Sequence, residues 1–380
     1  MALIKVNNRG QSADFGDKNR NLIINGAMQV SQRTVNETSV NSDRYSACDR
    51  FRIGNNMVHY TVSQETLTSS DAPFNEGFGK ALKLDVTTAQ ASPAATDYSH
   101  IQYRFEGQDL QGALYGTSNA KVMTLSFWVK ATKTGTNVIT FYQDDAAKQT
   151  SVSYTISASD TWEYKEVQCP ANVTDAITND KTRGFIIHWY LGAGSNRQSG
   201  SLQSTWTAYS TGDECPGQVN HGDSTSNNFH LTGVQFEYGD VKTPFEHRSY
   251  QEYFMDCARY CFVYGTQDDQ TGVYGTNSNA FIEYGYTQAA TAGVQNLKGP
   301  VPFRVVPSLA VSATGHVAQH LPGLVRSTCT SITTQSNLSS TVGLAVLTNI
   351  SSNANFTNGK LYMFEFQESQ RGWLKLDAEL

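Results

Sequence analysis

Apolar and polar side chains alternate along much of the chain. In Met123-Thr-Leu-Ser-Phe-Trp-Val129 every second residue is apolar, and similar alternation recurs in segments 82–86, 101–105, 139–141, 152–156 and 185–191. Successive side chains of a β-strand point to opposite faces, so each segment is predicted to bury one face and to leave the other polar. Gly, Asn, Asp and Ser residues separate these segments. The pattern therefore predicts a two-sheet β-sandwich over residues 20–247.

Two stretches depart from this alternation. Residues 193–228 are rich in Gly, Ser and Asn, which predicts a long surface loop with one short strand at Leu202–Tyr209. Residues 249–264 contain neither Gly nor Pro and predict a connecting helix within 248–264. Its expected buried stripe is Tyr250, Phe254, Cys257, Cys261 and Tyr264. We favour a helix that packs on the sandwich over the alternative, a three-helix contact on a symmetry axis.

Beyond Gly265 the sequence is again strand-like. Strands are predicted at Phe281–Tyr286, Leu361–Phe366 and Trp373–Leu376, whereas the proline-flanked segment 301–306 suits a sheet edge or a strand entry. Residues 265–380 are therefore predicted to form a second, smaller β-domain, and the whole chain is predicted to be all-β.

Composition supports this class. Of the 380 residues only 16% are charged, and Tyr, Phe, Thr, Ser, Asn and Gly are abundant. The formal net charge of −6 does not favour a nucleic-acid partner. We expect no membrane insertion and no signal peptide, because no apolar run has the required length. The six scattered cysteines are expected to be buried thiols of a protein made in a reducing cytosol.

Sequence motifs for catalysis are missing, so we expect no enzyme. Adjacent acids such as Asp144 and Asp145 suit a solvated turn better than the separated acid pair of a glycosidase. The eight histidines show no metal-binding pattern on a helix, and no nucleophile elbow, phosphate loop or dinucleotide fingerprint occurs.

Two motifs far apart in the chain match a known family. Residues 21–33 read NLIINGAMQVSQR and are followed by Asp49-Arg-Phe51; the second motif is Leu231-Thr-Gly-Val-Gln-Phe-Glu-Tyr-Gly239 with Thr243-Pro-Phe-Glu-His-Arg248. Together they resemble a sandwich domain of bacteriophage virion proteins, especially tail fibres and their adaptors. The family more often has Trp where this chain has Phe51. The resemblance covers residues 20–264 and implies a jelly-roll topology, a first strand in the first motif and a second strand beginning at 49–51.

The resemblance implies a virion structural protein of the tail-fibre or receptor-binding class. Such a protein would be made in the host cytoplasm, assembled as a homotrimer, and attached to a glycan or protein of the host surface. Residues 1–19 would be an arm that binds other virion proteins, the alternative being a frayed end. The alternative functions are a capsid- or tail-decorating scaffold without receptor binding and, less favoured, a polysaccharide depolymerase.

The polar side of the predicted strands supplies the candidate site. We expect an aromatic and polar face that stacks on sugar rings and bonds their hydroxyls, or else forms a subunit interface, which we favour of the two. Its predicted members are Gln102, Arg104, Trp128, Tyr142, His188 and Tyr190. No cofactor is expected, although similar sugar-binding jelly rolls hold a structural calcium, for which Asp49 and Glu237 are the candidate ligands.

Overall fold

The computed structural model describes residues 20–265, 281–313, 316–321, 325–335, 338–350, 359–366 and 373–380. Their regular structure is almost entirely β, which confirms the predicted class. The chain divides into two compact units. Of the described residues, the first unit comprises 20–29, 36–249 and Leu380. The second unit comprises 30–35 and those within 250–379, including the short helix. The predicted attachment arm, residues 1–19, lies outside the described residues.

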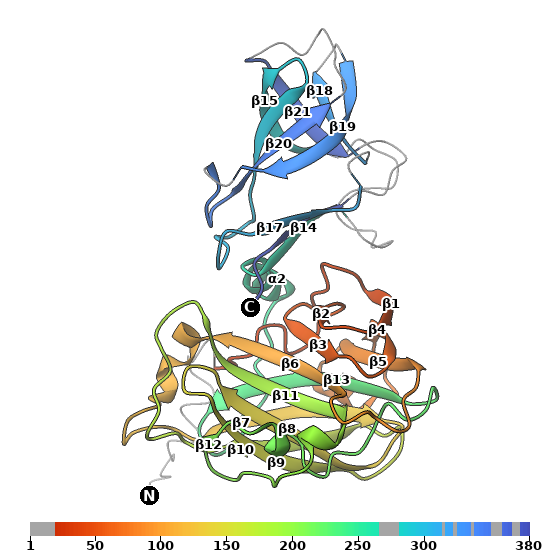
Figure 1. The fold of residues 1–380 in the computed structure, drawn as a ribbon, viewed down its shortest axis with the longest axis vertical. Coiled ribbons are helices and arrows are strands. Elements are labelled where there is room, and N and C mark those ends of the chain that lie inside the picture. Colours follow the sequence, from red (N-terminus) through yellow and green to blue (C-terminus); the bar gives the residue numbers. More distant parts are fainter. Residues whose placement is uncertain are drawn as a thin grey trace, which may run out of the picture. The chain divides into compact units, whose positions relative to one another are not determined.

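The first unit is a sandwich of two antiparallel sheets (Figure 1). The six-stranded sheet has the order β1 (Asn36–Val40), β4 (His59–Thr66), β5 (Lys80–Thr88), β13 (Asn228–Tyr238), β7 (Met123–Ala131) and β10 (Glu163–Cys169). The seven-stranded sheet has the order β12 (Thr207–Ala208), β9 (Lys148–Ile156), β8 (Gly135–Gln143), β11 (Arg183–Ala193), β6 (Tyr98–Glu106), β3 (Phe51–Asn55) and β2 (Arg44–Tyr45). The chain passes repeatedly from one sheet to the other, as expected for a jelly roll.

Alternation correctly predicted the core of this sandwich. The inward-facing side chains of β7 are all buried, as are the predicted inward sets of β6 and β11. Short 3-10 helices lie in the connections: η1 (Ala72–Glu76), η2 (Gly107–Ala113), η3 (Ser195–Arg197) and η4 (Thr211–Asp213). The six cysteines are buried, as expected.

The first family motif forms a buried turn, so the strand that the resemblance implied there was wrong. Leu22 N donates to Phe236 O at 2.9 Å, and Val234 N donates to Gly26 O at 2.9 Å. A Cβ on Gly26 would lie only 2.0 Å from the Val234 carbonyl oxygen, which explains the glycine. Asn25 adopts a left-handed φ of 62°, which turns the chain back instead of extending it. The two motifs are therefore bonded to each other.

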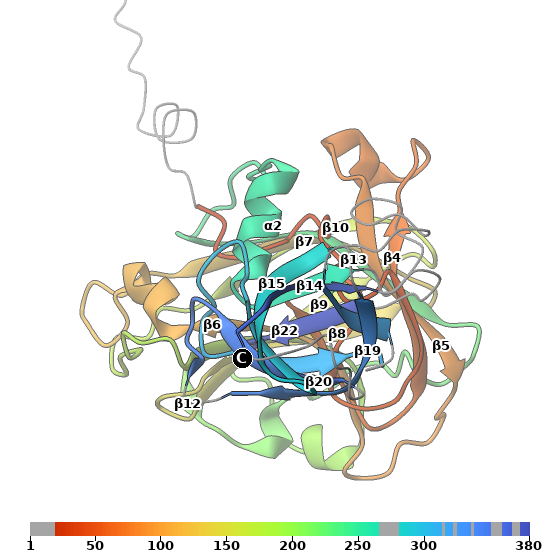
Figure 2. The ribbon, with the colours of Figure 1, turned by 90° about the horizontal axis from the view of Figure 1, so that it is seen from above.

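The second unit contains a three-stranded sheet and a closed six-stranded barrel, seen side-on in Figure 1 and from above in Figure 2. The sheet order is β14 (Cys261–Gly265), β22 (Trp373–Asp377) and β17 (Ser308–Val311). The barrel order is β15 (Phe281–Ala289), β16 (Ala292–Leu297), β20 (Leu344–Ile350), β19 (Val325–Thr334), β18 (Val317–Leu321) and β21 (Leu361–Phe366). The three predicted strands are confirmed. Residues 301–306 belong to no strand and precede β17, which agrees with a strand entry and not with a sheet-edge strand.

A tyrosine fills the interior of the barrel. Tyr362 is fully buried, and its ring occupies the space where side chains on Gly285 and Gly293 would stand. Its hydroxyl donates to Gln295 Oε1 and lies 3.3 Å from Thr348 Oγ1. Two glycines on neighbouring strands thus make room for one large ring with a satisfied polar end.

The helix is shorter than predicted. Helix α2 (Tyr250–Ala258) ends before Cys261 and Tyr264, which lie in β14 and pair with β22. The expected stripe was only partly correct, because Cys257 is buried as predicted whereas Tyr250 is 60% exposed. The buried helical residues are Tyr253, Cys257 and Ala258. Backbone pairing along β14, a segment rich in aromatic and β-branched residues, replaces further helical turns. In the described part of the chain, no helix combines the length and apolarity needed to span a membrane.

Candidate functional site

An aromatic pair lies on the outer face of the six-stranded sheet. Phe127 and Val129 of β7 point into the core, so the alternation directs Trp128 outward. Tyr164 of β10 is its direct cross-strand partner. The two rings meet edge to face, with centroids 5.3 Å apart, and Tyr164 is 36% exposed. Ring surface is therefore available to a ligand at this position.

A glycine brings further aromatic groups next to this pair. Gly233 lies on the neighbouring strand β13, at an irregularity in its pairing with β7, and has φ of +60°. A Cβ there would lie 2.9 Å from Phe78 Cζ and 3.0 Å from Trp128 Cδ1. The missing side chain allows these two rings to approach each other above the strand.

Residues 242–247, which we call the wall, follow β13 and lie beside the outer face of the six-stranded sheet. Glu237 binds the start of this wall, accepting from Thr243 N at 2.9 Å and Thr243 Oγ1 at 2.6 Å. Farther along, Glu246 N donates to Gln235 Oε1 at 2.8 Å, and Asn21 N of the first motif donates to Glu246 Oε2 at 2.7 Å. Residues 242–247 are therefore fixed to β13 by the side chains of Gln235 and Glu237, and to the first motif by the backbone N–H of Asn21.

Three further rings line the cavity beside the Trp128–Tyr164 pair: Phe78, Phe245 and His247. Phe78 packs against Phe245 with centroids 4.7 Å apart, and His247 lies 5.0 Å from Phe78 and 4.8 Å from Phe245. The ring atom Nε2 of His247 lies 2.9 Å from the backbone oxygen of Glu76, which ties the wall to helix η1. The wall is thus joined to η1 as well as to β13.

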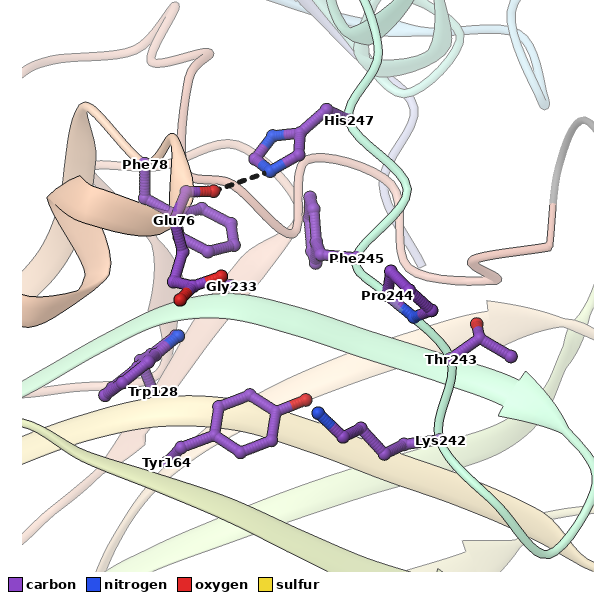
Figure 3. Close-up of a pocket in the computed structure, with 10 residues that line it drawn as sticks. All are labelled: Glu76, Phe78, Trp128, Tyr164, Gly233, Lys242, Thr243, Pro244, Phe245 and His247. Atoms are coloured by element: carbon purple, nitrogen blue, oxygen red, sulfur yellow. Dashed lines mark hydrogen bonds between the residues drawn. The ribbon is translucent and has the colours of Figure 1, made fainter. Parts of the chain in front are cut away.

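These parts enclose a cavity of about 740 Å³, drawn in Figure 3. We call it the aromatic cavity. Its lining residues are Glu76, Phe78, Trp128, Tyr164, Gly233, Lys242, Thr243, Pro244, Phe245 and His247. The volume lies in the range of small-molecule sites, and apolar ring surface with a few polar groups is typical of them. The charged side chains of Lys242 and Glu76 come from different parts of the lining (Figure 3).

The six predicted site residues do not share one face. Trp128 belongs to the six-stranded sheet, whereas the others lie on β6, β8 and β11 of the seven-stranded sheet. The residues separated from Trp128 in this way are Gln102, Arg104, Tyr142, His188 and Tyr190. The prediction of a single polar face was wrong because alternation assigns a side of a strand and not the sheet that the strand joins.

The seven-stranded sheet is also less open than predicted. Tyr190 is only 2% exposed, and its hydroxyl donates to Glu214 Oε2 at 2.9 Å. Glu214 also accepts from Arg197, and its backbone oxygen accepts from Thr140. The loop that carries Glu214 therefore covers this part of the sheet. Tyr142 is only half-buried, and its ring packs against that of Tyr209 with centroids 5.4 Å apart.

The remaining predicted residues form a compact polar cluster. Gln102 is 7% exposed; its Nε2 lies 2.7 Å from His100 Nε2, and its Oε1 accepts from Arg104 Nε at 3.1 Å. Burial lowers the pKa of Arg104 to about 10. Burial also lowers the pKa of His188 to about 3, so His188 is neutral at pH 7. Gln102 and Arg104 are thus bonded within the protein, whereas the ring atoms Nδ1 of His100 and His188 are buried without a hydrogen-bond partner among the described residues.

The predicted calcium ligands have other roles. Glu237 Oε1 accepts from Gln235 Nε2 at 2.8 Å and from Thr243 N, while Oε2 accepts from Thr243 Oγ1. Asp49 is 1% exposed, and its backbone oxygen accepts from Asn25 Nδ2 at 3.0 Å. Across the described residues, no three His, Cys, Asp or Glu side chains converge on a metal site. Because hydrogen-bond donors already occupy both Glu237 oxygens, this environment does not fit calcium.

Sequence reasoning identified Trp128 and missed the rest of the cavity. The Tyr164 strand was not predicted, although Glu163–Cys169 contains a short alternation. Lys242, Phe245 and His247 lie within or beside the quoted second motif, which was used only to recognise the family. A motif that continues past its strand into an aromatic-rich segment was the available signal.

No family model and no curated protein matches the sequence. Among solved structures, the chain is similar to the enzymatically active domain of tailspike protein 4 of bacteriophage CBA120, with 14% identity, TM-score 0.30, and coverage of 58% of this chain and 21% of that chain. It is also similar to a putative sugar-binding protein from Bacteroides thetaiotaomicron (13% identity, TM-score 0.32, 57% and 99% covered). A family 11 carbohydrate-binding module from Clostridium thermocellum has 12% identity and TM-score 0.26, with 55% and 99% covered. The likeness is one of β-sandwich fold and carries no argument about function.

Proposed function

We propose that the protein is a non-catalytic virion structural protein of the tail-fibre or receptor-binding class, and that its sandwich binds a host-surface glycan in the aromatic cavity. The two family motifs support the virion role. The observation that carries glycan binding is the outward-facing pair Trp128 and Tyr164, which lines a cavity of about 740 Å³.

The cavity has the chemistry that a sugar requires. The apolar C–H face of a sugar ring packs on an aromatic ring, while its hydroxyls need hydrogen-bonding groups at the rim. Trp128 and Tyr164 offer the rings, and Lys242, Thr243 and Glu76 offer polar groups. A ring pair held by cross-strand pairing is preorganised, so little side-chain entropy is lost on binding.

The lining favours binding over hydrolysis. A glycosidase places two carboxylic acids on either side of the bond that it cleaves. Among the described residues that line the aromatic cavity, Glu76 is the one carboxylic acid. A single acid supports the proposal of a non-catalytic attachment protein. In a homotrimer three such sites would act together, so that weak individual binding gives stable attachment.

The alternative use of this surface is a contact between subunits, since Trp and Tyr are also enriched in protein interfaces. The decisive experiment measures adsorption of the full-length protein to host cells together with its mass in light scattering. Trp128→Ala and Tyr164→Ala are expected to keep a trimeric mass and to weaken adsorption at least about fivefold, because an aromatic contact contributes about 1 kcal/mol.

Tyr284→Ala is the control, because Tyr284 is a 53% exposed tyrosine on the barrel and should leave adsorption unchanged. If Trp128→Ala and Tyr164→Ala dissociate the oligomer, the surface is a subunit interface. A wild-type protein of monomeric mass would contradict the trimer. Immunolabelled virions test the position of the chain: label at fibre tips supports receptor binding, and label over the head or tail surface supports a decorating scaffold.

A further inference from the structure

Lys242 is an exposed cation that lines the aromatic cavity. Its Nζ lies 4.5 Å from the centroid of the Tyr164 ring. No carboxylate of the described residues forms an ion pair with it. By contrast, Lys130 of β7 pairs with Asp71 at 3.7 Å, and Lys165 of β10 pairs with Glu163 at 2.6 Å. The lysines of the two strands are thus neutralised within the protein, whereas the cavity lysine is available to a ligand.

The charges of the lining are separated. Figure 3 shows the Lys242 ammonium next to the Tyr164 hydroxyl, and the Glu76 carboxylate between Phe78 and Trp128. A ligand that lies across the aromatic rings therefore meets two hydrogen-bond donors at one end and an acceptor at the other. This polarity favours a ligand with an anionic group at one end and hydroxyl donors at the other.

We propose that the glycan bound here is acidic, with a carboxylate or phosphate group held by Lys242 and the Tyr164 hydroxyl. Its hydroxyls donate to Glu76. The inference rests on the proposed glycan-binding function and adds the substrate class. The cation–π contact keeps the ammonium above the phenol ring, so the charge is positioned before the ligand arrives. Glu76 repels the same anionic group and thereby sets the orientation of the sugar.

The test is a glycan microarray probed with the full-length protein. The array carries uronic-acid and phosphorylated saccharides, each beside its carboxyl-reduced or dephosphorylated neutral counterpart. Wild-type protein is expected to prefer the charged member of a pair by about two- to fivefold, the size of one accessible charge contact. The preference is expected to shrink as salt is raised from 50 to 500 mM, values chosen to shorten the Debye length from roughly 14 to 4 Å.

Variants separate the substrate class from the binding function. Lys242→Met should remove the preference for the charged member without loss of binding to its neutral counterpart, and Lys242→Arg should retain it. Glu76→Gln should keep or raise binding to the charged member, because repulsion is removed. Lys165→Met, which removes an internally paired lysine, is the matched control and should not change the preference.

The outcomes are distinguishable. Trp128-dependent binding of neutral saccharides alone would overturn the acidic-glycan inference and leave the glycan function in place. A charge preference that survives Lys242→Met would also overturn it. Absence of any Trp128-dependent saccharide signal would refute the proposed function and the inference together.

Discussion

A single methyl group at Gly233 tests how the aromatic cavity is built. The backbone there has φ of +60°, and an added Cβ would lie 2.9 Å from Phe78 Cζ and 3.0 Å from Trp128 Cδ1. An alanine in the left-handed region costs about 1 kcal/mol, and forcing two packed rings apart costs about a further 1–3 kcal/mol. Gly233→Ala is therefore expected to lower the free energy of unfolding of the sandwich by about 2–4 kcal/mol.

Urea unfolding followed by tryptophan fluorescence measures this loss, because four of the five tryptophans lie in the sandwich. Gly217→Ala is the control: its φ is +81°, and no heavy atom of the described residues other than its chain neighbours lies within 4 Å of the added Cβ. It should lose only the backbone contribution of about 1 kcal/mol. Equal losses in the two variants would refute the argument that Phe78 and Trp128 require a glycine at position 233.

Two further predictions concern pH and the barrel. Burial lowers the pKa of His221 to about 4 and that of His188 to about 3, whereas the unfolded chain takes up these protons near pH 6.5. The free energy of unfolding therefore has its full value, as far as these two histidines are concerned, above pH 6.5. It decreases as the pH falls toward 4, by at most about 1.4 kcal/mol per pH unit for each histidine. Urea unfolding at pH 7 and pH 5 should show the loss, and His221→Gln should reduce it; an unchanged pH dependence in that variant would contradict the assignment. In the barrel, Gly285→Ala places a Cβ 2.5 Å from the Tyr362 ring and should destabilise the second unit by about 1–3 kcal/mol. Hydrogen exchange should then accelerate in the barrel strands and not in the sandwich, and equal acceleration in the sandwich would contradict an effect confined to the second unit.

The sequence by itself determined the fold class and most of the core. Segments such as 101–105 and 123–129 alternate with period two, and their apolar residues are buried in the structure as predicted. This works because the side-chain direction along a strand depends only on local backbone geometry. The two family motifs also carried long-range information, since Asn21 and Gly26 of the first bond to the strand formed by the second.

Only the tertiary structure decided which outward-facing residues meet. Trp128 and Tyr190 both point away from the core in their strands, but the two strands belong to different sheets. Tyr190 is moreover covered by the loop that carries Glu214. Likewise, the strand pairing of β14 with β22 ended the helix before Cys261. Which sheet a strand joins, which loop covers it and which strand it pairs with all depend on residues distant in the chain. The local periodicity of the sequence therefore cannot predict them. The aromatic cavity arises where β7, β10 and β13 meet the 242–247 wall, which is why one of its residues was predicted and its shape was not.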